Sequence, residues 1–528
     1  MTHGVRRPWV SRIRATPSQS AVWSDQLPSA NCHRSSLFRH GVASGDPLTD
    51  GVIIWTRLER PGELRWTVAT DEALRHVVMA GESTAEEVND LTVKVDVTGL
   101  EPDTEYYYFF EAQGETSPVG RTRTLPVDTD HLRFALCSCA KYSAGYFNAY
   151  ARLAELDDIA FVLCSGDYIY EYGNNEKGLG SKIDRAFEPD NECRTLEDYR
   201  TRYSQYRRDP QLQLLHQRHP FVNIIDDHEF CNNTWRDGAG KHDVKEDGPW
   251  EERREAAFRA WREWIPVRLP DSDDPSRIFR TFHAGDLLDL IVLDTRTRRD
   301  KQTKDAEEIE QENRTLLGRE QFDWFEGEAG RAGSTWLLVA NGVMMGQVRS
   351  DFMPEDLGNP LSELGVLTKR EHGPEPDQWD GYPVERRRLL EAIRDRRDSN
   401  VVFLSGDCHS SWVMDVKLDP HDPVEETIGA EFCTTSITSE NLDDEAGWDP
   451  RTKSLDVEKE IMDKNPHIHW VETDSHGYVA LDVTRERIQA DWWFVDAIHC
   501  RHGGLHHGAG WVVQSGDYRI ERGAGPVT

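Results

Sequence analysis

The stretch LCSGDYIYEY, residues 163–172, constrains the fold of this chain more than any other. An apolar run ends abruptly there at a Ser-Gly-Asp turn, which presents Asp167, and Tyr170 follows three residues later. A buried strand that stops at a small turn places the next carboxylate at the carboxyl edge of a sheet. Open α/β folds bind their ligands at that edge.

The same arrangement returns far downstream. The apolar run Val401–Leu404 is followed by a second Ser-Gly-Asp turn, which presents Asp407, and His409 comes two residues later. The sequence therefore predicts that the two junctions meet as halves of one metal site.

The chain from about Phe38 to Pro126 alternates between apolar and polar residues over short stretches such as Gly51–Trp55 and Leu91–Val97. A period of two with regular turn residues indicates an antiparallel β-sandwich. The segment Leu100–Tyr108 has the form of the tyrosine corner of immunoglobulin-like sandwiches, in which a tyrosine hydrogen-bonds back across the loop. We expect this sandwich to be an accessory domain without chemistry of its own.

Beyond a polar link at 121–130, predicted strands and helices alternate, which indicates βαβ units. The predicted strands are Leu132–Leu136, Ile159–Leu163, Phe221–Ile225, Leu287–Leu293, Thr335–Val339 and Val401–Leu404. The predicted helices are Phe147–Leu156, Leu196–Arg207, Glu251–Trp264 and Arg319–Gly327. The charged stretch at 300–313 reads as a solvated loop or lid.

The formal net charge is −33, and only 13 of the 62 basic residues are lysine. Such a surface repels nucleic acid and anionic membranes, so we expect no stable nucleic-acid partner. Two explanations of this composition stay open: adaptation to high salt, or an acidic protein encoded by an arginine-rich genome. Nine cysteines without framework spacing argue against a disulfide scaffold, and no apolar run approaches the length of a membrane span.

Chemically capable side chains recur where the predicted strands end. They are Cys139, Asp167 with Tyr170, Asp226–Glu229, Asp294, and Asp407 with His409. One such aspartate alone is usually a turn residue, and one cysteine alone is usually a small buried hydrophobe. Together, a carboxylate, a phenolate and a thiolate suit a trivalent ion, and further carboxylates with an amide oxygen suit a divalent ion. Two such ions clamp the attacking and leaving oxygens of a phosphoryl displacement.

Eight motifs occur in one order along the chain. They are Ser138-Cys139, Gly166–Glu171, Asp226–Glu229, Asn232-Asn233, Leu293–Arg296, Trp379–Tyr382, Gly406–His409 and His476–Tyr478. In this order the chain resembles the PhoD-type alkaline phosphatases, which belong to the calcineurin-like and purple-acid-phosphatase-like metallophosphatases. The resemblance runs from about residue 38 to about 498.

The resemblance implies an α/β fold, the four-layer α+β metallophosphatase sandwich, preceded by an immunoglobulin- or fibronectin-like β-sandwich. It implies an irregular arm at 1–37, the β-sandwich at 38–126, the catalytic domain at 131–498, and a tail at 499–528 that packs on the catalytic domain.

The resemblance also implies roles for single residues. Asp167 would bridge two metals, and Cys139, Tyr170 and His409 would complete the site of a ferric ion (Fe³⁺). Asp227 and Asp407, joined by Asn232 or Asn233, would hold the second metal, which is calcium (Ca²⁺) in this family. His228 would protonate the leaving group or steady the phosphate, and Glu229 would orient it.

Several alternatives stay open at this level. Cys137 competes with Cys139 as the thiolate ligand, and the Ser-Cys pair favours Cys139. Asp226 is either a ligand or a hydrogen-bond partner of His228. Arg296 is either a phosphate contact or a structural ion pair. The histidines near the chain's end, His499, His502, His506 and His507, are a weaker candidate for zinc.

The predicted function is that of a metal-dependent phosphoric ester hydrolase. A metal-bound hydroxide would attack a phosphomonoester or phosphodiester in line, and the partners would be small-molecule phosphate esters. The alternatives are a phospholipase-D-like phosphodiesterase and a non-catalytic surface binding protein on the same fold. The family is usually exported by the twin-arginine route; Arg6-Arg7 fit a remnant of such a leader, but no apolar segment follows, so a cytoplasmic location is the alternative.

Overall fold

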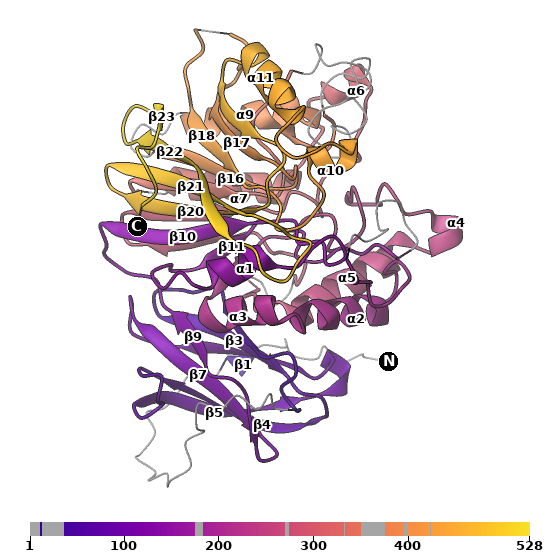
Figure 1. Ribbon diagram of the computed structural model, residues 1–528, viewed down its shortest axis with the longest axis vertical. Helices are drawn as coiled ribbons and strands as arrows, with labels where there is room; N and C mark the ends of the chain where they lie inside the picture. The colour runs from indigo at the N-terminus through magenta and orange to yellow at the C-terminus, as the bar shows by residue number, and fades with distance from the viewer. Residues whose placement is uncertain are drawn as a thin grey trace.

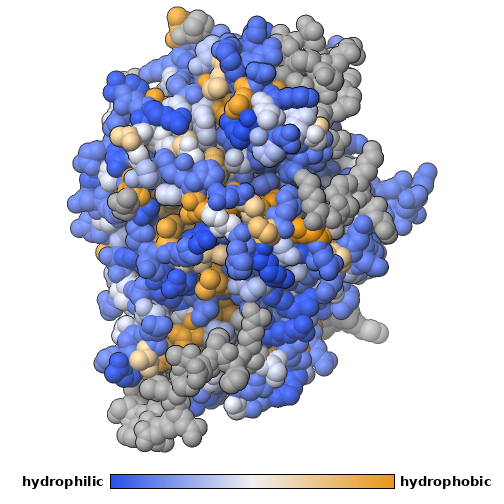
Figure 2. Space-filling view, viewed as in Figure 1, coloured by the Kyte–Doolittle hydropathy of each residue, from blue (hydrophilic) through white to orange (hydrophobic). Residues whose placement is uncertain are grey.

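The computed structural model describes residues 11–12, 36–174, 183–269, 274–331, 333–349, 375–394, 400–422 and 424–527. Figure 1 shows the N-terminal β-sandwich at the bottom, a group of helices above it, and two stacked sheets above these. The face in Figure 2 is mainly hydrophilic, as the net charge of −33 leads one to expect.

The N-terminal region is a β-sandwich, as predicted. One of its sheets contains β2 (Val42–Gly45), β3 (Gly51–Arg57) and β6 (Thr92–Thr98), with the short β1 (Ser11–Arg12) beside β6. The other contains β4 (Gly62–Ala69), β5 (Val77–Ala85), β7 (Glu105–Ala112), β8 (Glu115–Thr116) and β9 (Gly120–Arg123). A short 3₁₀ helix, η1 (Glu87–Asn89), precedes β6.

Side chains from both sheets fill the sandwich core because alternate residues of each strand point inward. On β7 these are Tyr106, Tyr108 and Phe110, all buried. The hydroxyl of Tyr106 accepts the backbone N–H of Glu101 at 2.9 Å, which confirms the predicted tyrosine corner.

A large sheet continues from the sandwich into the rest of the chain, because β2 pairs with β12 (Phe221–Asn223). Next to β12 lie the parallel strands β11 (Val162–Cys164) and β10 (His131–Cys137). An antiparallel run follows, made of β20 (Gly477–Thr484), β21 (Arg487–Val495), β22 (Leu505–Gln514) and β23 (Ile520–Arg522). The segment expected as a packed tail thus contributes the last two strands of this sheet.

The second sheet of this part of the chain has seven strands. In spatial order they are β13 (Arg280–Ala284), β14 (Leu288–Val292), β15 (Trp336–Ala340), β16 (Asn400–Ser405), β18 (Gly429–Cys433), β17 (Ser411–Val416) and β19 (Ile468–Glu472). β14, β15, β16 and β18 are parallel. A shared apolar core that includes Phe134, Leu290, Leu338 and Trp492 packs the two sheets against each other.

Helices cover the outer face of each sheet, which completes four layers. The large sheet is covered by α1 (Asn148–Leu153), α2 (Leu196–Arg207), α3 (Pro210–Arg218) and α5 (Trp250–Trp264), and the seven-stranded sheet by α7 (Gly318–Arg331) and α9 (Pro383–Arg394). The remaining helices are α4 (Val244–Asp247), α6 (Ala306–Ile309), η2 (Trp379–Gly381), α10 (Leu442–Ala446) and α11 (Ser454–Lys464).

Local sequence explains why α2 has the predicted bounds. Thr195 accepts the N–H of Asp198, and the Asp198 carboxylate accepts the N–H of Thr195, so the two form a capping box at the N-terminus. Tyr199, Tyr203 and Tyr206 lie on its buried face. These rings tie the helix to the sheet that carries the first metal-site junction.

No helix among the described residues is long and apolar enough to cross a membrane. The eight cysteines in the described ranges are free thiols, in line with the prediction that the chain has no disulfide scaffold.

Candidate metal centre

The predicted ligands lie just beyond the carboxyl ends of four parallel strands. Cys139 follows β10, Asp167 follows β11, Asp227 follows β12, and Asp407 with His409 follows β16. β10, β11 and β12 belong to one sheet and β16 to the other, and a bridge between Ser138 and Ser436 links the sheets at this edge. The two Ser-Gly-Asp junctions therefore meet, as expected.

Two groups of ligand atoms at this edge are compact enough to hold an ion. In the first, Cys139, Asp167 and His409 each offer one atom, all within 4.8 Å of one another. In the second, Asp226, Asp227 and Asp407 do the same. A third group joins them, because Asp167 and Asp227 also come together with His228. The three groups are contiguous, because the third shares Asp167 with the first and Asp227 with the second.

Tyr170 belongs to the first group. Its hydroxyl donates to Asp167 Oδ2 at 2.9 Å and lies 3.1 Å from His409 Nε2. Cys139 is buried beside these groups, whereas Cys137 ends β10 and is buried in the apolar core opposite Cys164. Cys139 is therefore the thiol that the fold brings to the cluster.

The first group is electrostatically costly without a cation. Burial, reinforced by the charge of Asp167, raises the pKa of Cys139 well above its usual value. Burial also raises the pKa of Tyr170 and of Asp167. Each of these groups resists ionisation because its neighbours are acids too. A bound cation reverses this and favours the thiolate, the carboxylate and the phenolate together.

The histidine of the first group is already arranged as a ligand. His409 Nδ1 donates to the carbonyl oxygen of Glu440 at 2.9 Å, which leaves the lone pair of Nε2 facing Tyr170. Metal-ligating histidines commonly fix their second nitrogen in this way. Burial lowers the pKa of His409 to about 4, so the imidazole is neutral.

The second group contains carboxylate oxygens that have no hydrogen-bond partner in the described part of the chain. Asp226 Oδ2 and Asp227 Oδ1 are buried and have no hydrogen-bond partner among the described residues. Buried carboxylate oxygens are normally satisfied, so their lone pairs suit a cation. The residues present therefore fit a metal in both groups.

Arg296 shares the second group with the acids. Its guanidinium is fully buried and forms ion pairs with Asp226, with Asp377 at 2.7 Å and with Asp407 at 2.8 Å. Burial raises the pKa of Asp407 to about 6, although Arg296 opposes the rise. Of the two alternatives for Arg296, the structure has the ion pair, and Asp226 pairs with Arg296 rather than with His228.

His228 lies beside both groups and has a carboxylate partner. Its Nδ1 is 2.7 Å from Glu171 Oε2, and its ring stacks on Tyr170 with the centroids 4.1 Å apart. Burial disfavours the imidazolium, but the charges of Asp227, Glu171 and Asp167 outweigh burial and raise the pKa of His228 to about 10.

The prediction that Glu229 orients His228 is wrong. Glu229 instead accepts the backbone N–H groups of Asp167, Tyr168 and Asp226 at 3.2, 2.6 and 2.7 Å. It braces the turns that carry the ligands, and Glu171 takes the predicted role. Glu171 directly follows Tyr170, so the sequence already showed a carboxylate next to a predicted ligand at the first Ser-Gly-Asp junction.

The Asn-Asn motif lies beside the second group and contacts it through a backbone N–H. Asn232 Oδ1 accepts the hydroxyl of Tyr172 at 2.9 Å, and the backbone N–H of Asn233 donates to Asp227 Oδ2 at 2.6 Å. Tyr172 also meets the ring of His228 edge-on, so it does more than pack.

Asp294, the fifth strand-end acid, does not join the cluster. It accepts the N–H groups of Arg296 and Thr297 at 3.1 and 2.9 Å and so forms a turn. This is the ordinary role of an aspartate after a strand. It helps to hold the backbone from which Arg296 reaches the acids.

The backbone is strained where the ligands are attached. Cys139, Asp167, Asp407 and His409 all have φ between 47° and 65°, in the left-handed region. Non-glycine residues seldom adopt this region, and such strain clusters at functional sites. Gly166 has φ 98°, and a Cβ there would lie 2.3 Å from the Cβ of Asp226, so the close approach of the two turns requires glycine.

A segment that the sequence did not single out encloses the first group. We call residues 434–441, which follow β18, the clamp loop. Ser439 contacts Tyr170, and the carbonyl of Glu440 holds His409. Lys141 in turn binds the Glu440 carboxylate at 2.8 Å. The small polar residues of the clamp loop resemble those of an ordinary turn, so nothing in the sequence indicates that they lie at the site.

Two other candidates fall outside the centre. His506 and His507 pair with Asp496 and Asp491, and neither is in a metal-like group of the described residues. A fourth group, Glu171, Glu192 and Cys231, is compact; none of its members is a predicted ligand, and Glu171 pairs with His228 and Glu192 with Arg253.

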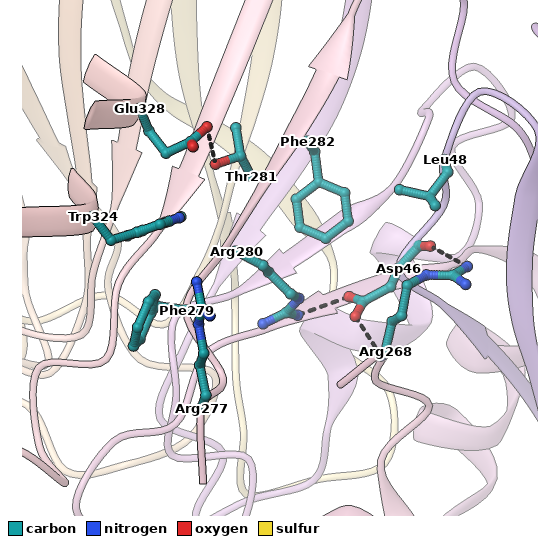
Figure 3. A pocket seen from close by; sticks show the side chains of 10 residues that line it. All are labelled: Asp46, Leu48, Arg268, Arg277, Phe279, Arg280, Thr281, Phe282, Trp324 and Glu328. Atoms are coloured by element: carbon teal, nitrogen blue, oxygen red, sulfur yellow. Dashed lines mark hydrogen bonds and ion pairs between the residues drawn. The ribbon is translucent and has the colours of Figure 1, made fainter. Parts of the chain in front are cut away.

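A cavity of about 290 Å³ lies apart from these groups, between the sandwich and β13 (Figure 3). Asp46 at its wall pairs with Arg280 at 2.7 Å and accepts the N–H of Arg268 at 2.6 Å. None of the predicted ligands lines the cavity. We interpret it as part of the contact between the sandwich and the remainder of the chain.

The four layers and the paired strand-end ligand groups define a metallophosphatase. The model of the PhoD-like phosphatase family matches residues 134–492, and that of the PhoD-like phosphatase N-terminal domain matches residues 24–126. The chain belongs to the PhoD-like phosphatase family. The predicted family and fold are confirmed.

Individual relatives agree with this assignment. The chain is 36% identical over 500 residues to alkaline phosphatase D of Bacillus subtilis (strain 168), covering 89% of this chain and 80% of that protein. A solved structure described as that of PhoD superposes with a TM-score of 0.81 at 33% identity, covering 94% of each chain. The purple acid phosphatase PPD1 from yellow lupin seeds shares the fold, with a TM-score of 0.51 at 11% identity over 90% of this chain and 73% of that one. The chain is an alkaline phosphatase D-like phosphoesterase, a phosphoric ester hydrolase, and the family implies metal ions.

Proposed function

We propose that the chain hydrolyses small phosphate monoesters or diesters with a ferric ion and a calcium ion. Cys139, Tyr170 and His409 would hold the ferric ion, and Asp167 would bridge to the second ion. Asp227, Asp407 and Asn232 would complete the calcium site. The main support is the position of Asp167, which shares a compact group with Cys139 and His409 and another with Asp227.

The choice of ions follows from the donor atoms. A thiolate, a phenolate and an imidazole around one carboxylate favour iron over a hard divalent cation. The second site offers carboxylate oxygens, which calcium prefers. Asn232 Oδ1 accepts the hydroxyl of Tyr172 with one lone pair, and the other would be the one offered to calcium.

When bound, the two ions would polarise the phosphoryl group and lower the pKa of the attacking water. His228 would protonate the leaving oxygen. Glu171 accepts the proton on Nδ1, so the proton available to a substrate is the one on Nε2. Stacking on Tyr170 and the edge contact with Tyr172 keep the ring in one orientation.

The test compares p-nitrophenyl phosphate with bis-p-nitrophenyl phosphate, which separates monoester from diester preference. Asp167→Asn should abolish turnover of both and release metal. Asp294→Asn is a matched control, because Asp294 is also a buried carboxylate after a strand but lies outside the cluster. Asp167→Asn with the parent's activity and metal content would refute the bridging role.

A further inference from the structure

The clamp loop touches every group around the predicted ferric site except the bridging carboxylate. The carbonyl oxygen of Cys139 accepts the N–H groups of Thr438 and Ser439, both at 3.3 Å. His409 Nδ1 donates to the Glu440 carbonyl, and the Ser439 hydroxyl lies 2.7 Å from the Tyr170 hydroxyl oxygen. Ser439 is fully buried and Tyr170 almost fully, so water does not substitute for this contact.

A count of protons fixes the direction of the Ser439–Tyr170 hydrogen bond. The Tyr170 hydroxyl has one proton and faces two acceptors, Asp167 Oδ2 at 2.9 Å and His409 Nε2 at 3.1 Å. It therefore has none left for Ser439, and Ser439 must be the donor.

The Ser439 hydroxyl has two possible acceptors, and Tyr170 is the one that lacks another donor. The Ser439 hydroxyl has a second acceptor, the Cys139 carbonyl at 3.0 Å. That oxygen already receives two backbone N–H groups, which match its two lone pairs. The phenol oxygen of Tyr170 is therefore the favoured acceptor of the Ser439 hydroxyl proton.

We propose that Ser439 is a positioning residue that sets the electronic properties of Tyr170 as a metal ligand, an inference that rests on the proposed ferric site. A tyrosine that binds a metal has lost its proton, so the hydrogen bond from Ser439 becomes charge-assisted and stronger. Of the groups within hydrogen-bond distance of that oxygen in the described part of the chain, Ser439 is the one with a proton to give.

Such a bond has two measurable effects. It lowers the energy of the phenolate electrons, so the charge-transfer band from phenolate to ferric ion lies at shorter wavelength. It also fixes the ligand oxygen in place, and loss of a partner of this kind costs about 10- to 100-fold in metal affinity. Removing the Ser439 hydroxyl should therefore move the band to longer wavelength and weaken metal retention.

The experiment uses the full chain purified without chelator. The parent, Ser439→Ala and Ser439→Thr are compared by visible spectrum and by metal retained after dialysis against graded chelator. Thr438→Val is the matched control, since it removes the neighbouring hydroxyl, which donates to the Lys141 carbonyl at 2.8 Å and does not touch Tyr170.

We expect Ser439→Ala to absorb at longer wavelength and to lose metal at about 10- to 100-fold lower chelator concentration. Ser439→Thr and Thr438→Val should keep the parent's band. An unshifted band in Ser439→Ala, or equal metal loss in Ser439→Ala and Thr438→Val, would overturn the role of Ser439.

The two claims fail in different ways. A parent that holds a metal but shows no band refutes the ferric assignment, and the chelator series then decides the role of Ser439 for that metal. A parent that holds no metal contradicts both claims.

Discussion

Replacing Glu171 with glutamine tests which carboxylate serves His228. Glutamine keeps the size of the side chain and an acceptor oxygen for the Nδ1 proton, but it removes the charge. Glu171 is fully buried, 2.7 Å from His228 Nδ1, and also accepts the N–H of Asn232 at 2.7 Å. Because the two N–H groups bind different oxygens of Glu171, a glutamine whose oxygen faces His228 would keep that hydrogen bond in neutral form and leave the N–H of Asn232 facing its NH2 group.

The expected loss follows from the strength of the hydrogen bond. A bond to a charged group contributes about 1.5–3 kcal/mol, and a neutral one about 0.5–1.5 kcal/mol. The change therefore costs about 1–1.5 kcal/mol, or about 5- to 13-fold in rate if it falls on the protonation step. Complete loss of an acid catalyst would cost about 10²- to 10⁴-fold.

The assay compares leaving groups. p-Nitrophenolate departs readily without a proton, whereas phenolate and alkoxides need one. Glu171→Gln should therefore reduce kcat on phenyl and alkyl phosphates and leave p-nitrophenyl phosphate nearly unchanged. Because the Glu171 charge raises the pKa of His228, its removal should also move the alkaline loss of activity to lower pH.

Glu229→Gln is the control. Glu229 accepts three backbone N–H groups, so its replacement should lower the free energy of unfolding without any dependence on the leaving group. Equal losses on all esters in Glu171→Gln, or a leaving-group effect in Glu229→Gln alone, would refute the assignment of Glu171.

Three further changes, two at the centre and one at His40, are tested by urea unfolding of the metal-free protein. Arg296→Met leaves Asp226 and Asp407 unpaired and should cost about 3–5 kcal/mol; a cost below about 1 kcal/mol would contradict the ion pair. Gly166→Ala forces a Cβ against Asp226 at positive φ and should cost about 2–5 kcal/mol; an unchanged midpoint would show that the turns separate easily. Burial lowers the pKa of His40 from 6.5 to about 4, so the unfolded chain takes up its proton first and stability falls as the pH drops through this range, by up to about 1.4 kcal/mol per pH unit. His40→Asn should flatten this slope and leave the pH dependence above 7 unchanged; the parent's slope in the variant would exclude His40.

Much of the fold follows from local patterns in the sequence. The period of two predicted the sandwich strands, and the capped, tyrosine-rich segment predicted α2 with its observed bounds. The connection between β2 and β12 had no local signal, because a single backbone pairing creates it. The last two strands were also missed, since Leu505–Gln514 is rich in glycine and histidine and gains its strand only beside β21.

The candidate site also has a part that the sequence predicts and a part that it does not. The residues at the two Ser-Gly-Asp junctions come together because parallel strands end at one edge, which is a property of the topology. Ser439 supports them through a contact with a residue far away in the sequence, for which the chain gives no local signal. The left-handed backbone at Cys139 was equally invisible, since cysteine does not favour it.

The most direct test of the two-metal account is elemental analysis of the full chain purified without chelator, together with its visible spectrum. The account predicts about one iron and at least about one calcium per chain. It also predicts a tyrosinate band that disappears in Tyr170→Phe while the calcium remains. Zinc in place of iron, or an iron protein whose band survives Tyr170→Phe, would contradict the account.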